Sequence, residues 1–167
     1  TISGGGVYLK DTDIATLLSN TIRANSAITE GGGVFFDNSD ATLQENTIES
    51  NSSRIGGGIV LRSSAATIND NDTLKNSASS VGGGLEIIGS NVNLVNNRIY
   101  SNTANVGGGL QVGSSSGASF INNLVRYNTA VVNGGGMDFS TSGAALVRNN
   151  VIADNQASFK GSGVLVS

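Results

Sequence analysis

Hydrophobic and small residues recur along the whole chain with a period of 25 to 27 residues. An apolar, variable, apolar triad follows a glycine triplet in every repeat, and alternation with a period of two is typical of a β-strand with one buried face. We therefore expect one strand directly after each triplet. The triplets begin at Gly4, Gly31, Gly56, Gly82, Gly107 and Gly134, and Gly161-Ser-Gly163 is a seventh copy. The apolar pairs are Val7 and Leu9, Val34 and Phe36, Ile59 and Leu61, Leu85 and Ile87, Leu110 and Val112, Met137 and Phe139, and Val164 and Val166.

Two more apolar columns and two asparagine columns keep the same period, so each repeat is predicted to contain three short strands. The first apolar column is Leu17, Leu43, Ile68, Leu94, Phe120 and Val147. Asparagine follows three residues after each member, at Asn20, Asn46, Asn71, Asn97, Asn123 and Asn150. The second asparagine column is Asn25, Asn51, Asn76, Asn102, Asn128 and Asn155. The apolar column between them is Ile22, Ile48, Ile99, Val125 and Ile152, with Leu74 displaced by one position in the third copy.

This arrangement predicts an all-β fold, a right-handed parallel β-helix of about six and a half coils with three short strands per coil. A leucine-rich repeat would need a helix where the glycine triplet stands, and a propeller blade needs about 40 residues or more. One coil buries too few apolar side chains to offset the conformational entropy of its backbone, so it depends on the coils above and below. We expect residues 1–167 to form a single β-helix domain, cut from a longer chain.

The asparagine and glycine columns are expected at the corners of the coil. Asparagine tolerates the left-handed backbone conformation that a tight corner needs, and its amide can bond the equivalent amide one coil away. The middle glycine of each triplet has the parity of the buried apolar pair. We therefore expect it to point inward and leave room for a large residue such as Phe120.

The amino-acid composition excludes several kinds of catalytic and metal-binding site. The chain has no Cys and no His, which excludes disulfides, thiolate or histidine metal sites and imidazole catalysis. Nine basic residues, scattered singly in a chain of net charge −3, form no stripe that would neutralise phosphates, so we expect no nucleic-acid partner. No apolar run approaches the roughly 18 to 20 residues that cross a bilayer, so we expect no direct membrane insertion. No cofactor is predicted.

The repeats resemble those of bacterial surface β-helix proteins. The copy Val125-Arg-Tyr-Asn128-Thr-Ala130, followed by the triplet at Gly134, is similar to the repeats of the polymorphic outer membrane proteins and related adhesins. These proteins combine a Gly-Gly-Ala-aliphatic motif with a Phe-x-x-Asn motif. Phe120-Ile-Asn-Asn123 matches the second motif, whereas Gly58 and its equivalents replace the alanine of the first. The resemblance implies an extracellular or cell-surface location and a fold that adhesins, passenger domains, tailspikes and pectin-cleaving enzymes share.

Candidate chemistry lies on the outward positions of the strands that follow the glycine triplets. Glu86 and Asp138 are two coils apart in this column, roughly 9.6 Å by the strand spacing, which approaches the separation of the two acids in an inverting glycosidase. Tyr8 and Phe35 could stack on sugar rings, and Gln111 is a third candidate ligand-binding residue. The simpler interpretation, which we favour, is an ordinary solvated face with two acids on it.

Acidic residues also suggest one weak metal site. Asp11, Asp13 and Asp40 form a candidate Ca²⁺ site, because Asp13 and Asp40 occupy equivalent places in successive coils. Lys10 and Asp37 are also equivalent, and we expect them to form a solvated ion pair between coils.

The sequence favours a structural or adhesive scaffold of a secreted or cell-surface bacterial protein over an enzyme. The alternative is a carbohydrate-binding or polysaccharide-cleaving β-helix protein of the pectin-lyase-like kind. Expected partners are surface glycans or other surface proteins. Open coil ends expose β edges, which natural solenoids cap, so we also expect neighbouring coils or subunits there.

Overall fold

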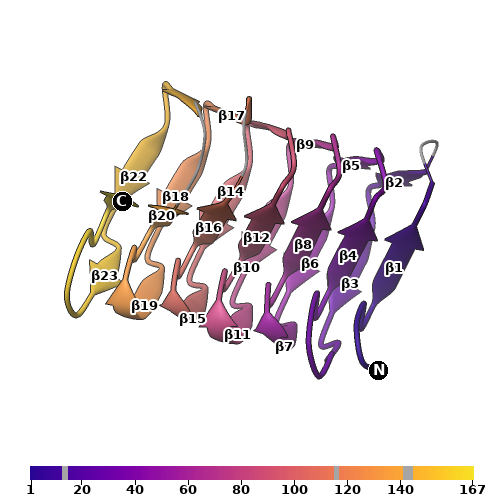
Figure 1. Ribbon diagram of the computed structural model, residues 1–167, viewed down its shortest axis with the longest axis horizontal. Coiled ribbons are helices and arrows are strands. Elements are labelled where there is room, and N and C mark those ends of the chain that lie inside the picture. Colours follow the sequence, from indigo (N-terminus) through magenta and orange to yellow (C-terminus); the bar gives the residue numbers. More distant parts are fainter. Residues whose placement is uncertain (13–14, 115–116, 141–144) are drawn as a thin grey trace.

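The computed structural model describes residues 1–167 except 13–14, 115–116 and 141–144. All the regular secondary structure of the described residues is β-strand, and the chain winds into a stack of similar coils from Thr1 to Ser167 (Figure 1). Every strand pairs in parallel with the equivalent strand of a neighbouring coil. The repeat period of the sequence is therefore one turn of a solenoid. Among the described residues there is no helix of the length and apolar character that a membrane span needs.

The three strands predicted for each coil are present, and each forms a sheet along the stack. The seven-stranded sheet, which follows the glycine triplets, contains β1 (Val7–Lys10), β4 (Val34–Asp37), β8 (Ile59–Arg62), β12 (Leu85–Ile88), β16 (Leu110–Gly113), β20 (Met137–Ser140) and β24 (Val164–Val166). The next sheet contains β2 (Thr16–Leu18), β5 (Thr42–Gln44), β9 (Thr67–Asn69), β13 (Asn93–Val95), β17 (Ser119–Ile121) and β21 (Leu146–Arg148). The third contains β3 (Thr21–Arg23), β6 (Thr47–Glu49), β10 (Asp72–Leu74), β14 (Arg98–Tyr100), β18 (Leu124–Arg126) and β22 (Val151–Ala153).

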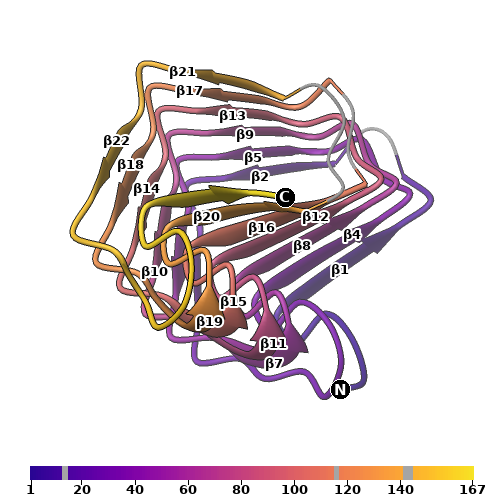
Figure 2. The same cartoon turned by 60° about the vertical axis from the view of Figure 1, so that its left-hand side comes forward.

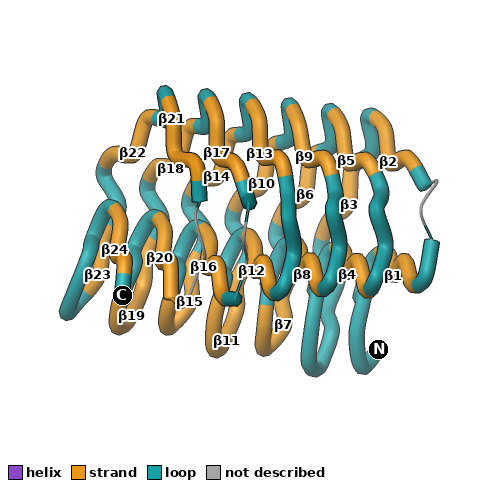
Figure 3. Tube along the Cα trace, turned by 45° about the horizontal axis from the view of Figure 1, so that its top comes forward, coloured by secondary structure: helices purple, strands orange, loops and turns teal. Residues whose placement is uncertain are grey.

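A fourth strand, which the sequence pattern does not predict, completes most coils. This sheet contains β7 (Ser52–Ile55), β11 (Ser77–Val81), β15 (Thr103–Val106), β19 (Thr129–Asn133) and β23 (Gln156–Ala157). Its inward residues are small, such as Ser53, Ala78 and Ala104, so it lacks the large apolar residues that identify a strand in a sequence. Figure 2, a view more nearly along the stack, shows these strands beside the start of the seven-stranded sheet, and Figure 3 shows the short corners between strands.

The core is a set of apolar columns inside the coils. Phe36, Leu43 and Ile48, one from each of three successive strands, are completely buried, and their equivalents in neighbouring coils lie in register with them. The third column differs in one coil from the sequence prediction. Thr73, not Leu74, is in register with Ile48 and Ile99 and is completely buried. The strand thus keeps its register and takes a threonine into the core.

Both predicted asparagine ladders are present. In the first, Asn46 Nδ2 donates to Asn71 Oδ1 (3.0 Å), and in the second Asn76 Nδ2 donates to Asn102 Oδ1 (3.1 Å). The left-handed residue of each corner, however, is the one before the asparagine, for example Glu45 (φ 54°). The prediction on this point was wrong, because the asparagine spans the corner with its side chain. Asn46 Nδ2 also donates to the carbonyls of Leu17 and Gln44 (2.8 and 2.7 Å).

A serine ladder, which the sequence pattern did not reveal, stabilises a further corner. The backbone N–H of Ser39 donates to Ser64 Oγ, and the N–H of Ser64 donates to Ser90 Oγ, both over 3.0 Å. All three serines are buried. Serine is common in this chain, so a column of three does not stand out without the structure.

The glycine triplets bring two parts of each coil close together. A Cβ on the middle residue Gly57 would lie 2.5 Å from the carbonyl carbon and oxygen of Ser77. The expectation that the middle glycine makes room for Phe120 was therefore wrong. It makes room for the backbone of the corner that follows the second asparagine column. A Cβ on the third residue, Gly33, would meet the core side chain of Ile48 at 2.9 Å.

Candidate functional site

The predicted column of outward residues exists on the seven-stranded sheet. We call it the outer row, and it consists of Tyr8, Phe35, Val60, Glu86, Gln111, Asp138 and Leu165. Register pairs Glu86 with Gln111 and Gln111 with Asp138. The two candidate acids are therefore two coils apart, as predicted, with the Gln111 side chain in the coil between them.

From Phe35 to Asp138, the outer row is not the solvated face that the sequence suggested. Only 3% of Phe35, 3% of Glu86 and 2% of Asp138 is exposed. The first glycine of each triplet accounts for part of this burial, because it packs against the outer-row residue four positions later. A Cβ on Gly82 would lie 2.9 Å from the Cβ of Glu86. The chain thus bends at the glycine, with a φ of 64° at Gly82, and encloses one side of the row.

The Gln111 amide links the Glu86 carboxyl group to the Ser140 hydroxyl group. When the amide nitrogen faces an ionised Glu86, it donates to both carboxylate oxygens, the longer contact being 2.7 Å, and the amide oxygen accepts from Ser140. In the opposite orientation, Nε2 donates to Ser140 Oγ, and a protonated Glu86 can donate to the amide oxygen. The orientation of Gln111 is therefore coupled to the protonation of Glu86.

Burial makes Glu86 a carboxylic acid rather than a carboxylate at neutral pH. Loss of solvation raises its pKa to about 9, and the charge of Asp138 acts in the same direction. The positive charge of Arg62 lowers the pKa, and Glu30 raises it. Loss of solvation also raises the pKa of Asp138, while a hydrogen bond from Ser140, which belongs to the orientation in which Gln111 Nε2 donates to Ser140 Oγ, lowers it. Among the described residues, Asp138 Oδ1 has no hydrogen-bond partner.

Arg62 and Glu30, which were not among the residues predicted for a site, complete the charged surroundings of the outer row. Arg62 Nη2 donates to Glu30 Oε1, and its guanidinium lies 6.0 Å from the centre of the Phe35 ring. Ser140 was missed in the same way. Arg62 and Ser140 each stand two residues after an outer-row residue and so project from the same face of the sheet. This spacing was the signal that could have identified them.

The two aromatic candidates are in contact with each other. The rings of Tyr8 and Phe35 stack with centres 5.2 Å apart and planes at 13°. Tyr8 is 46% exposed, and its hydroxyl donates to Asp37 Oδ2 over 3.1 Å. The predicted ion pair of Lys10 with Asp37 is present at 3.9 Å. Of the three candidate ligand-binding residues, only Tyr8 has a substantial exposed surface, because Phe35 and Gln111 are buried.

The candidate Ca²⁺ site cannot be assembled from the described residues. Asp13 lies outside them. Asp11 Oδ1 accepts from Asn38 Nδ2 over 2.9 Å, and Asp40 Oδ1 accepts from the backbone N–H of Ala65 over 2.6 Å. The part of the chain that the structure describes contains no group of three acidic side chains that could hold a metal ion.

The outer row combines a neutral acid, an amide and a second carboxyl group in a line along the stack. In a glycosidase, two acids act on opposite sides of the bond that is cleaved, and both reach the substrate. Glu86 and Asp138 instead lie in one row on one sheet and are almost fully buried. The geometry is that of a buried polar network that feels the charge of Arg62, not of two acids that face each other across a cleft.

A comparison with known protein families supports the β-helix fold. A family model described as a right-handed beta helix region matches residues 1–73 and, in an overlapping second match, residues 32–167. Together the two matches span the whole chain. No curated protein and no solved structure matches it.

Proposed function

Because the chain belongs to the right-handed beta helix family, we propose that it is a structural scaffold of a secreted or cell-surface protein. In this role the coil is a rigid rod whose exposed side chains attach to other molecules. The surface location is supported by the resemblance of the repeats to those of polymorphic outer membrane proteins. The single observation that carries the scaffold role is the burial of both candidate acids, because a substrate could not reach them without rearrangement of the row.

Rigidity is the second support for a scaffold. The two asparagine ladders continue from coil to coil, and each central amide is bonded on both sides. Asn102, for example, accepts from the backbone and side chain of Asn76 and donates to Asn128. Buried networks with all their groups satisfied favour one well-defined structure. A rod of this kind holds its outer side chains at fixed spacings, as multivalent attachment requires.

A polysaccharide-cleaving protein is the second candidate, and one observation favours it. With a pKa of about 9, Glu86 keeps its proton at pH 7, which is the state that a general acid requires. Asp138 would then be the second acid of the reaction. A non-catalytic carbohydrate-binding role would instead depend on the exposed ring of Tyr8.

One assay separates these functions. The purified chain is incubated with a panel of neutral and acidic polysaccharides, and new reducing ends and chain shortening are measured. The scaffold predicts no release of product. Release that is lost in both Glu86→Gln and Asp138→Asn, but kept in the exposed-site control Glu45→Gln, would contradict the scaffold and support cleavage. Binding without cleavage that is lost in Tyr8→Ala would support carbohydrate binding at the outer row.

A further inference from the structure

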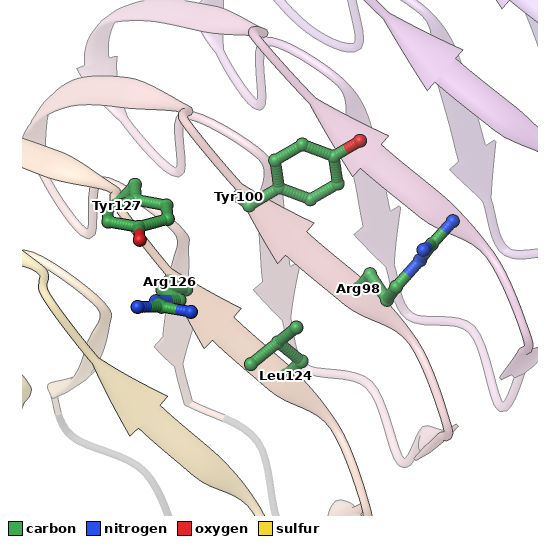
Figure 4. Close-up of a pocket in the computed structure, with 5 residues that line it drawn as sticks. All are labelled: Arg98, Tyr100, Leu124, Arg126 and Tyr127. Carbon is green, nitrogen blue, oxygen red and sulfur yellow. The ribbon is translucent and has the colours of Figure 1, made fainter.

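A hollow of about 180 Å³ lies on the outer face of the sheet formed by β14 and β18, away from the outer row. It is lined by Arg98, Tyr100, Leu124, Arg126 and Tyr127. Figure 4 shows Leu124 with Arg98 and Tyr100 on the preceding coil, with Arg126 on its own strand and with Tyr127 at the corner that follows this strand. Register pairs Arg98 with Leu124 and Tyr100 with Arg126.

Contacts within the chain position the side chains of both arginines. Arg98 forms a bidentate ion pair with Asp72 in the preceding coil, in which Nε and Nη2 donate to the two carboxylate oxygens. Arg126 Nε donates to Asp154 Oδ2 over 2.7 Å, and its guanidinium lies 4.4 Å from the centre of the Tyr127 ring. A guanidinium has five N–H donors, so each arginine retains donors beyond these contacts. Both acids lie outside the lining of the hollow, and the charged residues among the described lining residues are the two arginines.

Leu124 and Tyr127 differ in character from the residues at the equivalent positions of most other coils. Leu124 and Val151 occupy an outward position that is Thr21, Thr47, Asp72 and Arg98 in the earlier coils. Tyr127 stands at a corner with φ 57°, a conformation that bulky residues rarely adopt. Its side chain is 52% exposed, whereas the corresponding corners carry Ser50, Lys75, Ser101 and Asp154. Neither the core nor the ladders require an aromatic residue there.

This combination is typical of the centre of a protein–protein interface. Tyrosine and arginine are the side chains, with tryptophan, that most often contribute strongly to binding between proteins. The hollow is smaller than the roughly 300 to 1,000 Å³ of pockets that enclose a drug-sized ligand, so it has room for one side chain. An apolar side chain would cover Leu124 and the tyrosine rings, and acidic neighbours would complement the two guanidiniums. An acidic sugar would match the arginines but would leave the Leu124 surface against hydroxyl groups.

We propose that this hollow is a docking site for an extended acidic segment of a partner protein. An apolar side chain of the segment packs on Leu124, which is in register with Arg98 and two residues before Arg126, and carboxylates on either side pair with these two arginines. Side chains two residues apart in an extended segment lie on the same side, so the pattern recognised is acid, apolar, acid at alternate positions. The inference rests on the proposed scaffold role, because it names the kind of partner that the rod attaches.

The test uses a fluorescent peptide with Asp, Leu and Asp at alternate positions between Ser and Gly residues, and binding is measured by fluorescence anisotropy. Binding is expected to weaken as salt rises, because exposed charges are screened. Asn in place of both Asp residues, or Ser in place of Leu, should reduce binding of the peptide. In an NMR titration, the amide signals that move should cluster at residues 98–100 and 124–127.

Substitutions taken from equivalent positions of other coils keep the fold while they test the site. Arg98→Thr copies Thr47, and Tyr127→Ser copies Ser101. Each should weaken binding by ~5-fold or more. If either variant loses the β-sheet spectrum by circular dichroism, Tyr100→Leu, which copies Leu74, replaces it in the test. The matched control is Arg148→Asn on β21, which copies Asn69 and removes the same charge from another sheet, and it should bind as the parent does.

Several results would overturn the proposal. The proposal fails if the acidic peptide does not bind, or if the version with Asn in place of Asp binds as tightly. It also fails if Arg148→Asn weakens binding as much as the variants in the hollow do. Binding of an oligouronate at this hollow in place of the peptide would assign the site to acidic glycans and would also overturn it. The scaffold role fails by a different readout, because product release in the polysaccharide assay does not depend on the peptide.

Discussion

The side-chain amide of Asn102 donates to Oδ1 of Asn128 over 3.1 Å, and both residues are fully buried. Asn102 also accepts from the backbone N–H and the side chain of Asn76 and donates to the carbonyl of Thr73. One side chain thus joins three coils. Because nothing else fills these bonding positions when it is removed, the ladder is sensitive to loss of any central member.

We expect Asn102→Ala to lower the free energy of unfolding by ~3 kcal/mol, since several buried polar groups lose their partner at once. Urea denaturation followed by circular dichroism measures the change. Asn20→Ala, at the exposed beginning of the other ladder, removes fewer bonds and should cost less than half as much. Equal costs for the two variants would mean that the ladder bonds are not what stabilises the coil.

Replacement of Thr73 by valine should stabilise the protein. The Thr73 side chain is completely buried in an apolar column, and its Oγ1 has no partner among the described residues. Valine has nearly the same shape and removes the unpaired hydroxyl group, so the free energy of unfolding should rise by ~1 kcal/mol. Thermal and urea denaturation give the sign. Thr47→Val, on an outward position of the neighbouring strand, is the control and should change stability little.

Glu86 makes stability fall as pH rises. The pKa is about 9 in the folded chain and 4.5 for the free side chain, so between these values the folded state holds a proton that the unfolded state has lost. The stabilisation that the protonated Glu86 contributes to the free energy of unfolding is complete below pH 4.5 and is lost as pH rises toward 9. The free energy of unfolding then falls by at most ~1.4 kcal/mol per pH unit. Asp138, Arg62 and Glu30 are the charged groups that modify this slope.

Glu86→Gln should remove this pH dependence and make the protein more stable than the parent at pH 8, because a glutamine at this position resembles the protonated acid. Urea denaturation at a series of pH values measures the slope. Glu45→Gln, which removes the same charge at an exposed corner, should leave the slope in place. A parent protein whose stability is unchanged from pH 5 to pH 8 would show that Glu86 is ionised in the folded state.

Glycine positions differ in whether they can accept an alanine side chain. A Cβ on Gly57 would lie 2.5 Å from the Ser77 backbone and 2.6 Å from the Gly83 carbonyl oxygen, and backbone cannot move aside cheaply. Gly57→Ala should therefore cost ~3 kcal/mol or more. A Cβ on Gly113 would come no closer than 3.4 Å to a neighbouring atom, the Gln111 side-chain nitrogen. Gly113→Ala should stay within ~0.5 kcal/mol of the parent, and similar losses in both variants would contradict the close approach.

Much of the fold could be predicted from the sequence. The period, the three main strands and both asparagine ladders follow from residues that recur at equal spacing, because equivalent residues of successive coils lie next to one another. The positions of Glu86, Gln111 and Asp138 relative to each other followed from the same counting. Small or mixed residues gave no such signal, so the fourth sheet, the serine ladder of Ser39, Ser64 and Ser90, and the core position of Thr73 were missed.

The environment of the candidate sites depended on the tertiary structure. Alternation tells which side chains face the inside of a coil, but it does not tell which outward side chains another part of the same coil covers. The bend at Gly82 and its equivalents encloses the outer row, and this turned an expected solvated acid pair into a buried network. The sequence alone thus determined how the coils stack, because stacking depends on repetition. Only the tertiary structure decided which outer residues are open to a partner, because that depends on how each single coil bends.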